Sequence, residues 1–388
     1  MARTRWVLLA VLAVAGVATV LGLVLLWPDH SPRPDDSSAA FAAPGVTFPH
    51  ADVLAVQPAC KSVAEQGDGS STCGRIRVRV SSGDRAGDRA VVPVAPEVSR
   101  SGLSPGDSVQ LMRTPAQQGS PSQLSYSSVD RLPPIWVLTA VFVAAVALVA
   151  RLRGLLALVG LGFGAFVLVK FMLPALLTGA SGLGVALVGS SAIMFFVLYL
   201  AHGLSLRTST ALAGTLVGVL ITAVVGVVAV QSSRLTGIPD EGGAMLSGFF
   251  GNVDFQGLLT CAVIIAGLGV LNDVTITQAS AVWELRSAAP EMSQRALFGS
   301  GMRIGRDHIA STIYTIVFAY AGAALTVLLL LFLYDRPLLD LLSTEAIAEE
   351  VTRTLASAIG LVLAVPATTA IAVAVVAPRR HGGRTASL

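Results

Sequence analysis

Long apolar runs alternate with short polar stretches over most of the chain. The first run covers residues 6–27 and matches the roughly 20 residues that a helix needs to span a bilayer. Seven further runs follow residue 132, at 135–150, 154–177, 183–201, 209–230, 257–283, 309–334 and 355–377. The pattern predicts an α-helical polytopic membrane protein with about eight transmembrane helices.

Between the first and second apolar runs, apolar and polar residues alternate with a period of two. The clearest case is RIRVRV at 75–80, and ADVLAVQP, RAVVPV and SVQLMR are similar segments separated by Gly, Pro and Asp. Such alternation is typical of antiparallel strands that bury one face. We therefore predict a small all-β domain of four or five strands at 51–132. Arg75, Arg77 and Arg79 share one strand face, which is either solvated or in contact with lipid headgroups or a partner.

These elements divide the chain into five parts. We expect residues 1–27 to form an uncleaved signal-anchor helix, because the apolar run is longer than a signal-peptide core and no small-residue cleavage site stands out. Residues 28–50 are rich in Pro, Asp, Ser and Ala, which is typical of a linker. The β domain at 51–132, a seven-helix membrane core at 133–378 and a basic tail at 379–388 follow.

Composition supports the membrane assignment. Of the 388 residues 54% are hydrophobic and only 13% are charged, whereas soluble domains carry about 25% charged residues. The net charge of +3 comes mainly from arginines beside apolar runs, and no basic patch is interleaved with aromatic residues. The lipid bilayer is therefore an expected partner, and nucleic acid is not.

The arginines also predict the topology. With a cytoplasmic N-terminus, the inner loops and tail hold Arg151, Arg153, Arg207, Arg286, Arg295, Arg303, Arg306, Arg379, Arg380 and Arg384. The outer loops of the core keep only Arg234, Arg336 and Arg353, among seven acidic residues. Since positive residues concentrate on the cytoplasmic side, we expect both termini in the cytoplasm and residues 28–133 outside a bacterial inner membrane.

The cysteines occur in two settings. Cys60 and Cys73 flank a polar loop of the outer domain, whereas Cys261 lies in an apolar run, where we expect it only to pack. In an oxidising compartment Cys60 and Cys73 are candidates for a disulfide worth on the order of 3 kcal/mol. The alternative is a pair of free thiols.

Two polar stripes interrupt the apolar runs after residue 257. At helical spacing, the first stripe comprises Asp273, Thr277, Ser280 and Glu284 beside Asn272, and the second comprises His308, Ser311, Thr312 and Thr315 beside Arg306 and Asp307. Ionisable groups in a membrane cost roughly 2.5–3.5 kcal/mol each, so they usually face a bundle interior or an aqueous cavity. The pattern predicts a polar intramembrane site between the helices at 257–283 and 309–334.

Alternatives remain open for several of these residues. A position at the membrane surface fits Glu284, Arg306 and Asp307 as well as a position in the intramembrane site does, and it also fits Arg303. Asp273 has about ten or more uncharged residues on either side and is the stronger candidate for a buried carboxylate. Lys170, close to Pro174, either extends to the membrane surface or pairs with a carboxylate such as Asp273. For His308 no second His or Cys lies at ligand spacing, so neither a metal nor a cofactor is expected.

Small residues recur within the apolar runs, for example GTLVG at 214–218 and AGLGV at 266–270. They indicate close helix packing. The Gly-rich stretch at 233–257 is either a plain linker or a re-entrant lid.

Two segments resemble the signature segments of the YibE/F family of bacterial multi-pass membrane proteins. They are LGVLNDVTITQASAVWEL at 268–285 and GSGMRIGRDHIASTIYTIVFAYAG at 299–322, and the resemblance covers most of 130–378. It implies a membrane location and a core of about seven helices. It implies no reaction and supplies no catalytic residues.

Three functions from different classes fit the sequence. The first is a permease or ion-coupled transporter for a small solute or ion, with the polar stripes as its site. The alternative is a non-transporting scaffold or accessory subunit whose outer β domain binds a protein partner. An intramembrane hydrolase fits less well, because His308 and Ser311 lie on one helix, so we do not expect an enzyme. Oligomeric state is left open by the sequence.

Overall fold

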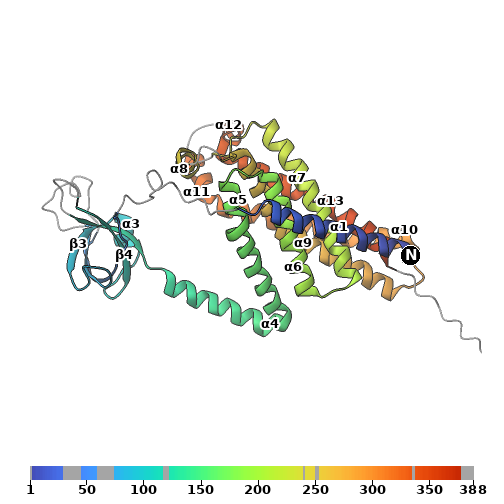
Figure 1. The fold of residues 1–388 in the computed structure, drawn as a ribbon, viewed down its shortest axis with the longest axis horizontal. Coiled ribbons are helices and arrows are strands. Elements are labelled where there is room, and N and C mark those ends of the chain that lie inside the picture. The colour runs from blue at the N-terminus through green and yellow to red at the C-terminus, as the bar shows by residue number, and fades with distance from the viewer. Residues whose placement is uncertain are drawn as a thin grey trace, which may run out of the picture. The chain divides into compact units, whose positions relative to one another are not determined.

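The computed structural model describes residues 2–28, 45–58, 74–116, 122–238, 241–249, 253–333 and 337–376. The chain divides into two compact units (Figure 1). One is Arg33–Ala145, and the other combines Met1–Pro32 with Val146–Leu388. Cys60, Cys73 and the basic tail at 379–388 lie outside the described residues.

The first unit contains a five-stranded antiparallel sheet. Its strands are β1 (His50–Val56), β2 (Arg75–Val80), β3 (Arg89–Pro93), β4 (Ser108–Thr114) and β5 (Gln123–Val129), in the order β3-β2-β1-β4-β5, with a short helix α3 (Pro96–Arg100) before β4. Alternation decides which face is buried: Ile76 and Val78 lie in the core, while Arg77 and Arg79 are exposed. The all-β domain after the first helix is confirmed.

Helices make up the second unit. They are α1 (Ala2–Leu25), α4 (Leu132–Val167), the π-helical segment η1 (Leu168–Met172), α5 (Leu173–Leu177), α6 (Gly182–His202), α7 (Leu206–Ser232), α8 (Glu241–Phe249), α9 (Phe255–Ala288), α10 (Gln294–Ala323), α11 (Leu325–Leu333), α12 (Leu338–Leu342) and α13 (Glu345–Val375). The first residues of α4, up to Ala145, belong to the first unit. The described residues include six helical stretches long and apolar enough to cross a membrane, or seven if α10 and α11 form one bent span.

The helical membrane class is thus confirmed, with six or seven candidate spans against about eight predicted from the sequence. The difference lies at 135–150 and 154–177, which the sequence suggests are two spans. The stretch Leu132–Leu177, 46 residues long, counts as one candidate span, although two helices meet in it at a kink. The backbone breaks within it only at Arg151, whose φ of 53° lies in the left-handed region.

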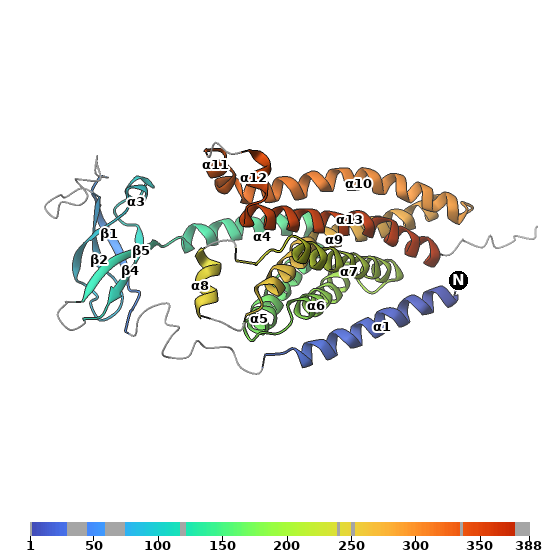
Figure 2. The same cartoon turned by 90° about the horizontal axis from the view of Figure 1, so that it is seen from above.

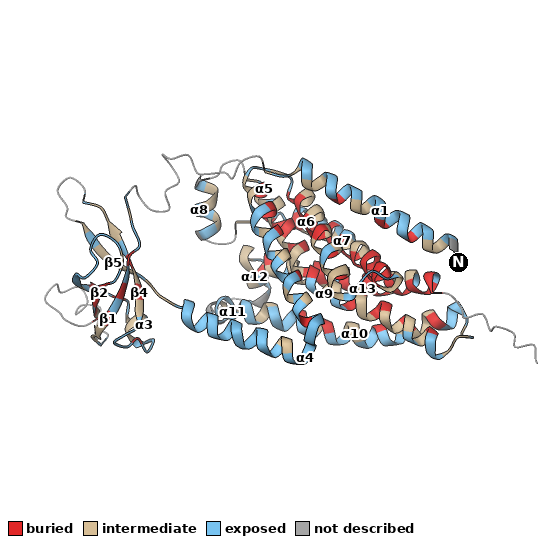
Figure 3. Cartoon of the chain, turned by 60° about the horizontal axis from the view of Figure 1, so that its bottom comes forward, coloured by how far each residue is buried: buried red, intermediate tan, exposed pale blue. Residues whose placement is uncertain are grey.

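Three helices, α7, α9 and α13, form the centre of the second unit, with α6, α10 and α1 around them (Figure 2). Buried residues gather on these central helices (Figure 3). Small residues permit the close approach of α7 to α9 and α13, because a side chain at Gly218 of α7 would meet Leu271 of α9 and Ala364 of α13. The close packing predicted from the small-residue runs is confirmed at this position.

The first and last spans meet at one end of this unit. The Arg5 side chain on α1 donates a hydrogen bond of 3.1 Å from Nε to the carbonyl oxygen of Val375 on α13. The carbonyl is one of the last in its helix, where a cation is favoured. The beginning of α1 and the end of α13 therefore lie side by side, as expected if both termini share one side of the membrane.

Candidate functional site

The polar stripe predicted on α9 runs along the exposed side of that helix. Asp273 and Glu284 are exposed, and Thr277 and Ser280 are half-buried, as is Asn272. The Thr277 hydroxyl donates to the backbone carbonyl of Asp273 at 2.7 Å. The helix begins at a well-formed cap, because the Asp254 carboxylate accepts from the Gly257 N–H at 2.9 Å.

The polar stripe predicted on α10 lies mostly on the surface as well. Arg306, Asp307, Ser311 and Thr315 are exposed, and His308 is half-buried. Thr312 belongs instead to the buried side of α10, with Gly301, Gly305 and Ile316. This helix therefore packs through small and apolar residues and turns its charges outward.

The structure does not bring the two stripes together into an enclosed site. Across the described part of the chain, no hydrogen bond or ion pair joins them. Lys170 is exposed on η1 and makes no ion pair with Asp273, so of its two alternatives the pair is not observed among the described residues. The stripes lie on the outside of the bundle, and a functional role for them stays a prediction.

A bilayer centred on α7 would place Asp273 within its hydrocarbon core. Thr275, two residues further along α9, shares a hydrogen bond of 2.6 Å with Thr215 of the antiparallel helix α7. Thr215 is nine residues from the start of α7, or about 13 Å at 1.5 Å per residue, and the whole of α7 is about 40 Å long. With a hydrocarbon core of about 30 Å centred on α7, Asp273 lies roughly 11 Å inside it. An exposed carboxylate there costs roughly 2.5–3.5 kcal/mol on insertion scales.

The interior holds polar side chains that the sequence analysis does not single out. Gln278, only 2% exposed, donates from Nε2 to the Gly301 carbonyl at 2.8 Å and to the Thr369 hydroxyl at 2.7 Å. It therefore joins α9 to both α10 and α13. Buried hydroxyls on the central helices include Thr208, Ser209, Thr210, Thr215, Thr222, Thr260, Thr275, Ser357, Thr368 and Thr369. This interior is closely packed and hydrogen-bonded.

Arg286 is a second buried group that the sequence misassigns. The positive-inside pattern places it in a loop, but it is 5% exposed at the end of α9. Its Nη1 donates to the carbonyl oxygens of Pro290 at 3.0 Å and Met292 at 2.6 Å. Arg286 therefore holds the short turn between α9 and α10.

A charged cavity lies where α10 and α11 meet. The two helices are bent by 70° at Ala324. A cavity of about 360 Å³ lies beside the bend, and its charged lining residues are Glu349, Glu350 and Arg353 of α13. Glu349 is 4% exposed, and Arg353 donates to Glu350 at 2.6 Å. An adjoining cavity of about 290 Å³ adds Tyr320 and Thr354 to the lining.

The sequence contains a signal for this cavity that hydropathy alone overlooks. The apolar run begins at 355, whereas α13 begins ten residues earlier at Glu345, directly after Thr344. Glu345 and Glu349 are four residues apart, and Glu350 and Arg353 are three apart, which is helical spacing. The charges attributed to an outer loop therefore belong to the first turns of the last span.

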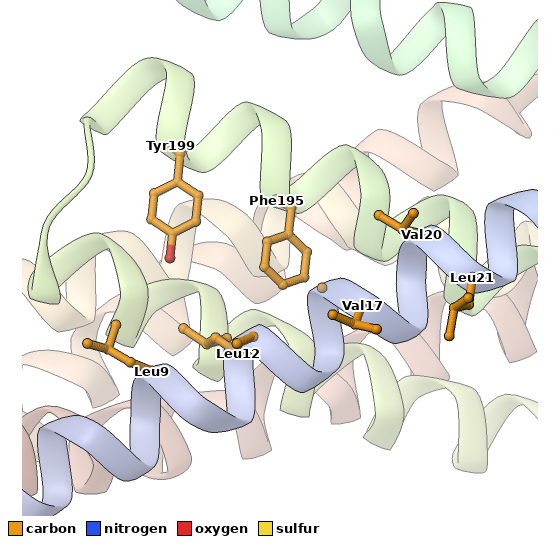
Figure 4. Close-up of a pocket in the computed structure, with 9 residues that line it drawn as sticks. Leu9, Leu12, Val17, Val20, Leu21, Phe195 and Tyr199 are labelled. Atoms are coloured by element: carbon orange, nitrogen blue, oxygen red, sulfur yellow. The ribbon is translucent and has the colours of Figure 1, made fainter.

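A larger cavity, of about 570 Å³, lies between α1 and α6 and is almost entirely apolar (Figure 4). Phe195 and Tyr199 project from α6 toward Leu12 and Val17 of α1. The Tyr199 hydroxyl shares a hydrogen bond of 2.9 Å with Ser209, so its polar atom is already satisfied. This lining suits acyl chains and offers little to a polar solute.

Within the described residues, no three or more His, Cys, Asp or Glu side chains are grouped so that they could hold a metal ion. A family model described as YibE/F-like protein matches residues 138–378. No curated protein and no solved structure matches the chain.

Proposed function

This chain belongs to the YibE/F-like protein family of multi-pass membrane proteins, and from that premise we propose that it is a permease or ion-coupled transporter. The observation that supports transport is the bent pair α10 and α11, which lines a cavity together with Glu349, Glu350 and Arg353. Transporter sites are commonly built at such discontinuous helices, whose ends offer unpaired backbone groups to an ion or substrate.

The charges beside the bend favour a small cation or a proton as the coupling ion. The charged side chains around the cavity are two carboxylates and one guanidinium, and carboxylate oxygens are the ligands that small hard cations prefer. The end of α10 adds the partial negative charge of a helix C-terminus. Glu349 is the buried carboxylate of this lining, so it is the first residue to substitute.

Flux measurements in proteoliposomes test this proposal. We expect wild-type protein to conduct protons or a small cation under one of a panel of imposed gradients, and Glu349→Gln to lose that flux. Asp340→Asn is the matched control, because Asp340 is an exposed carboxylate on α12 that does not line the cavity. Flux that survives in Glu349→Gln but disappears in Asp273→Asn would move the site to the α9 stripe. Absence of flux from folded wild type under every gradient would contradict transport.

One observation favours the alternative of a non-transporting scaffold. The centre of the bundle is sealed by glycine contacts and by the hydrogen bonds of Gln278, and Asp273 lines neither the two cavities at the α10–α11 bend nor the cavity between α1 and α6. In that case the β domain, with Arg77 and Arg79 exposed, would bind a protein partner. A folded wild-type protein without flux, but with a site-specific crosslink from Arg77 to one partner, would support the scaffold.

The membrane placement completes the proposal. We infer that both termini are cytoplasmic and that residues 28–133 lie outside the bacterial cell membrane. The positive-inside pattern supports this, as does the contact of Arg5 with Val375, which brings the two helix ends together. No enzymatic activity is proposed, because His308 and Ser311 are one turn apart on a single helix.

A further inference from the structure

We propose that the outer face of strands β2 and β3 binds the phosphate groups of anionic phospholipids in the membrane leaflet beside the β domain. This surface, the arginine face, consists of Arg77 and Arg79 on β2 and Arg89 and Val91 on β3, all exposed. Alternation along the strands turns these side chains away from the core, since Val78, between the two arginines of β2, is buried. The inference is independent of whether the protein transports an ion.

The strand register holds the three guanidinium groups close together. Arg79 pairs directly with Arg89 across β2 and β3, and Arg77 pairs with Val91. Residues directly opposite in an antiparallel pair have Cβ atoms about 4.5–5.5 Å apart, and Arg77 lies about 7 Å from Arg79 along the same strand face.

The charge of the face is left without a partner inside the domain. Among the described residues, none of its three arginines forms an ion pair. Asp52 of β1 lies opposite Arg79 on the other side, so three positive charges neighbour one negative charge. Like charges directly opposite each other destabilise a sheet, and an anion that binds across Arg79 and Arg89 relieves this repulsion. Guanidinium groups bind phosphate through paired hydrogen bonds, which makes phosphate the fitting anion.

The register also places the face at the end of the sheet from which the chain enters the membrane. One row of residues crosses the whole sheet at the level of Asp130, two residues before the candidate span begins at Leu132. In the order of their pairing, the members of this row are Asp130, Ser108, Asp52, Arg79 and Arg89. Strand β3 also contacts β5, so Arg89 lies on a strand that neighbours the entrance to the span.

Arg77 and Val91 lie still further toward that end of the sheet. Strands β1 and β5 point the same way, because both are antiparallel to β4, and β2 is antiparallel to β1. Arg77 and Val91 are therefore about 7 Å beyond the row, in the direction in which β5 leads to the span. Val91 is 54% exposed beside Arg77. Such a mixture suits the headgroup region, where an apolar side chain and arginine stems meet acyl chains and the guanidinium groups meet phosphate.

A lipid surface fits this face better than a soluble anion does. The two-residue connection to the span keeps the face beside the headgroups at a high effective concentration. A bilayer also presents many phosphates in one plane, so several arginines bind at once. Each arginine near an anionic membrane surface strengthens the attraction by about fivefold.

Thiol protection in the full chain, reconstituted in lipid nanodiscs, tests the contact. Val91→Cys places a thiol on the arginine face, and Ala86→Cys is the matched control, because Ala86 is exposed in the β2–β3 turn at the opposite end of the sheet. The probe is an uncharged polyethylene-glycol maleimide, and the wild-type chain supplies the background of the native cysteines. Phosphatidylglycerol mixed into phosphatidylcholine should slow labelling of Val91→Cys by about fivefold or more and leave Ala86→Cys unchanged. Equal rates at Val91→Cys in the two lipid mixtures would overturn the proposal.

Charge reversal tests the arginines themselves. Arg79→Glu should restore fast labelling of Val91→Cys in the anionic nanodiscs, and so should about 1 M salt, which screens surface charges. Arg100→Glu is the matched control, because Arg100 is exposed on α3, which packs through Val98 against the core and not on the arginine face. An unchanged rate at Ala86→Cys in the Arg79→Glu chain distinguishes lost contact from unfolding. Protection that survives Arg79→Glu, or that Arg100→Glu removes equally, would contradict the proposal. Protection seen only in native membranes would assign the face to another envelope component and likewise overturn it.

Discussion

The contact between α6 and α9 gives a sharp prediction for the substitution Gly182→Ala. Gly182 is the first residue of α6, and its backbone lies directly against Gly257 in the first turn of α9. A Cβ at Gly182 would lie 2.6 Å from the Gly257 Cα and closer still to the carbonyl group of that residue. Because the obstacle is backbone, no rotamer change can relieve the overlap.

The size of the effect follows from these distances. Non-bonded carbons are at their optimum about 3.5–4.0 Å apart, so the two helices must separate by about 1 Å. Overpacking of this kind costs about 1–3 kcal/mol. For a domain of about 150–250 residues, this corresponds to an unfolding temperature lower by roughly 2–12 °C.

Gly184→Ala is the matched control, two residues further along the same helical turn. Its Cβ would meet only side-chain atoms, the nearest being Leu26 Cδ1 at 3.6 Å, which is ordinary contact. We expect no loss of stability, and a gain of up to about 1 kcal/mol from the better helix propensity of alanine. Thermal unfolding of both purified variants, followed by tryptophan fluorescence, measures the difference. Equal unfolding temperatures would show that this close approach does not contribute to stability.

Three further substitutions test other parts of the fold. Gln278→Leu should lower the free energy of unfolding by about 1–3 kcal/mol, because it removes two buried hydrogen bonds that join α9 to α10 and α13, and thermal unfolding would detect this. Arg286→Ala should leave the bundle folded but speed amide hydrogen exchange in the turn at 289–293, whose carbonyls Arg286 holds. Leu111→Ala in the β core should cost about 2–5 kcal/mol, whereas Met112→Ala on the outside should change little, as seen in hydrogen exchange of the strands.

Elements with one dominant period could be predicted from the sequence. RIRVRV alternates strictly and forms β2, and the first apolar run forms α1 almost residue for residue. The first residue of each helix was harder to predict, because hydropathy identifies lipid-facing residues and does not identify the polar residues that cap a helix. Thus α10 begins at Gln294 instead of 309, since its first turns are polar and follow the Ser293 cap, whose hydroxyl accepts from the Ala296 N–H.

The candidate site shows why periodicity alone cannot assign burial. Spacing along α9 correctly places Asp273, Thr277 and Ser280 on one face of the helix. It does not say which face meets the other helices, because that depends on partners distant in sequence. Gln278, one of the buried polar residues of α9, lies on the opposite side, where Gly301 and Gly305 of α10 leave room for its amide.

The pairing of α7 with α13 has a consequence for how the protein is made. These two helices share the most extensive contact of the bundle, yet residues 233–344 separate them along the chain. At about 5–20 residues per second, the ribosome needs on the order of ten seconds to synthesise that interval. Thr222 of α7 therefore enters the bilayer well before Gly360, the α13 residue that packs against it, has been translated. Membrane insertion of the early spans must precede assembly of the core, and a nascent chain that lacks α13 has its central hydroxyl groups still uncovered.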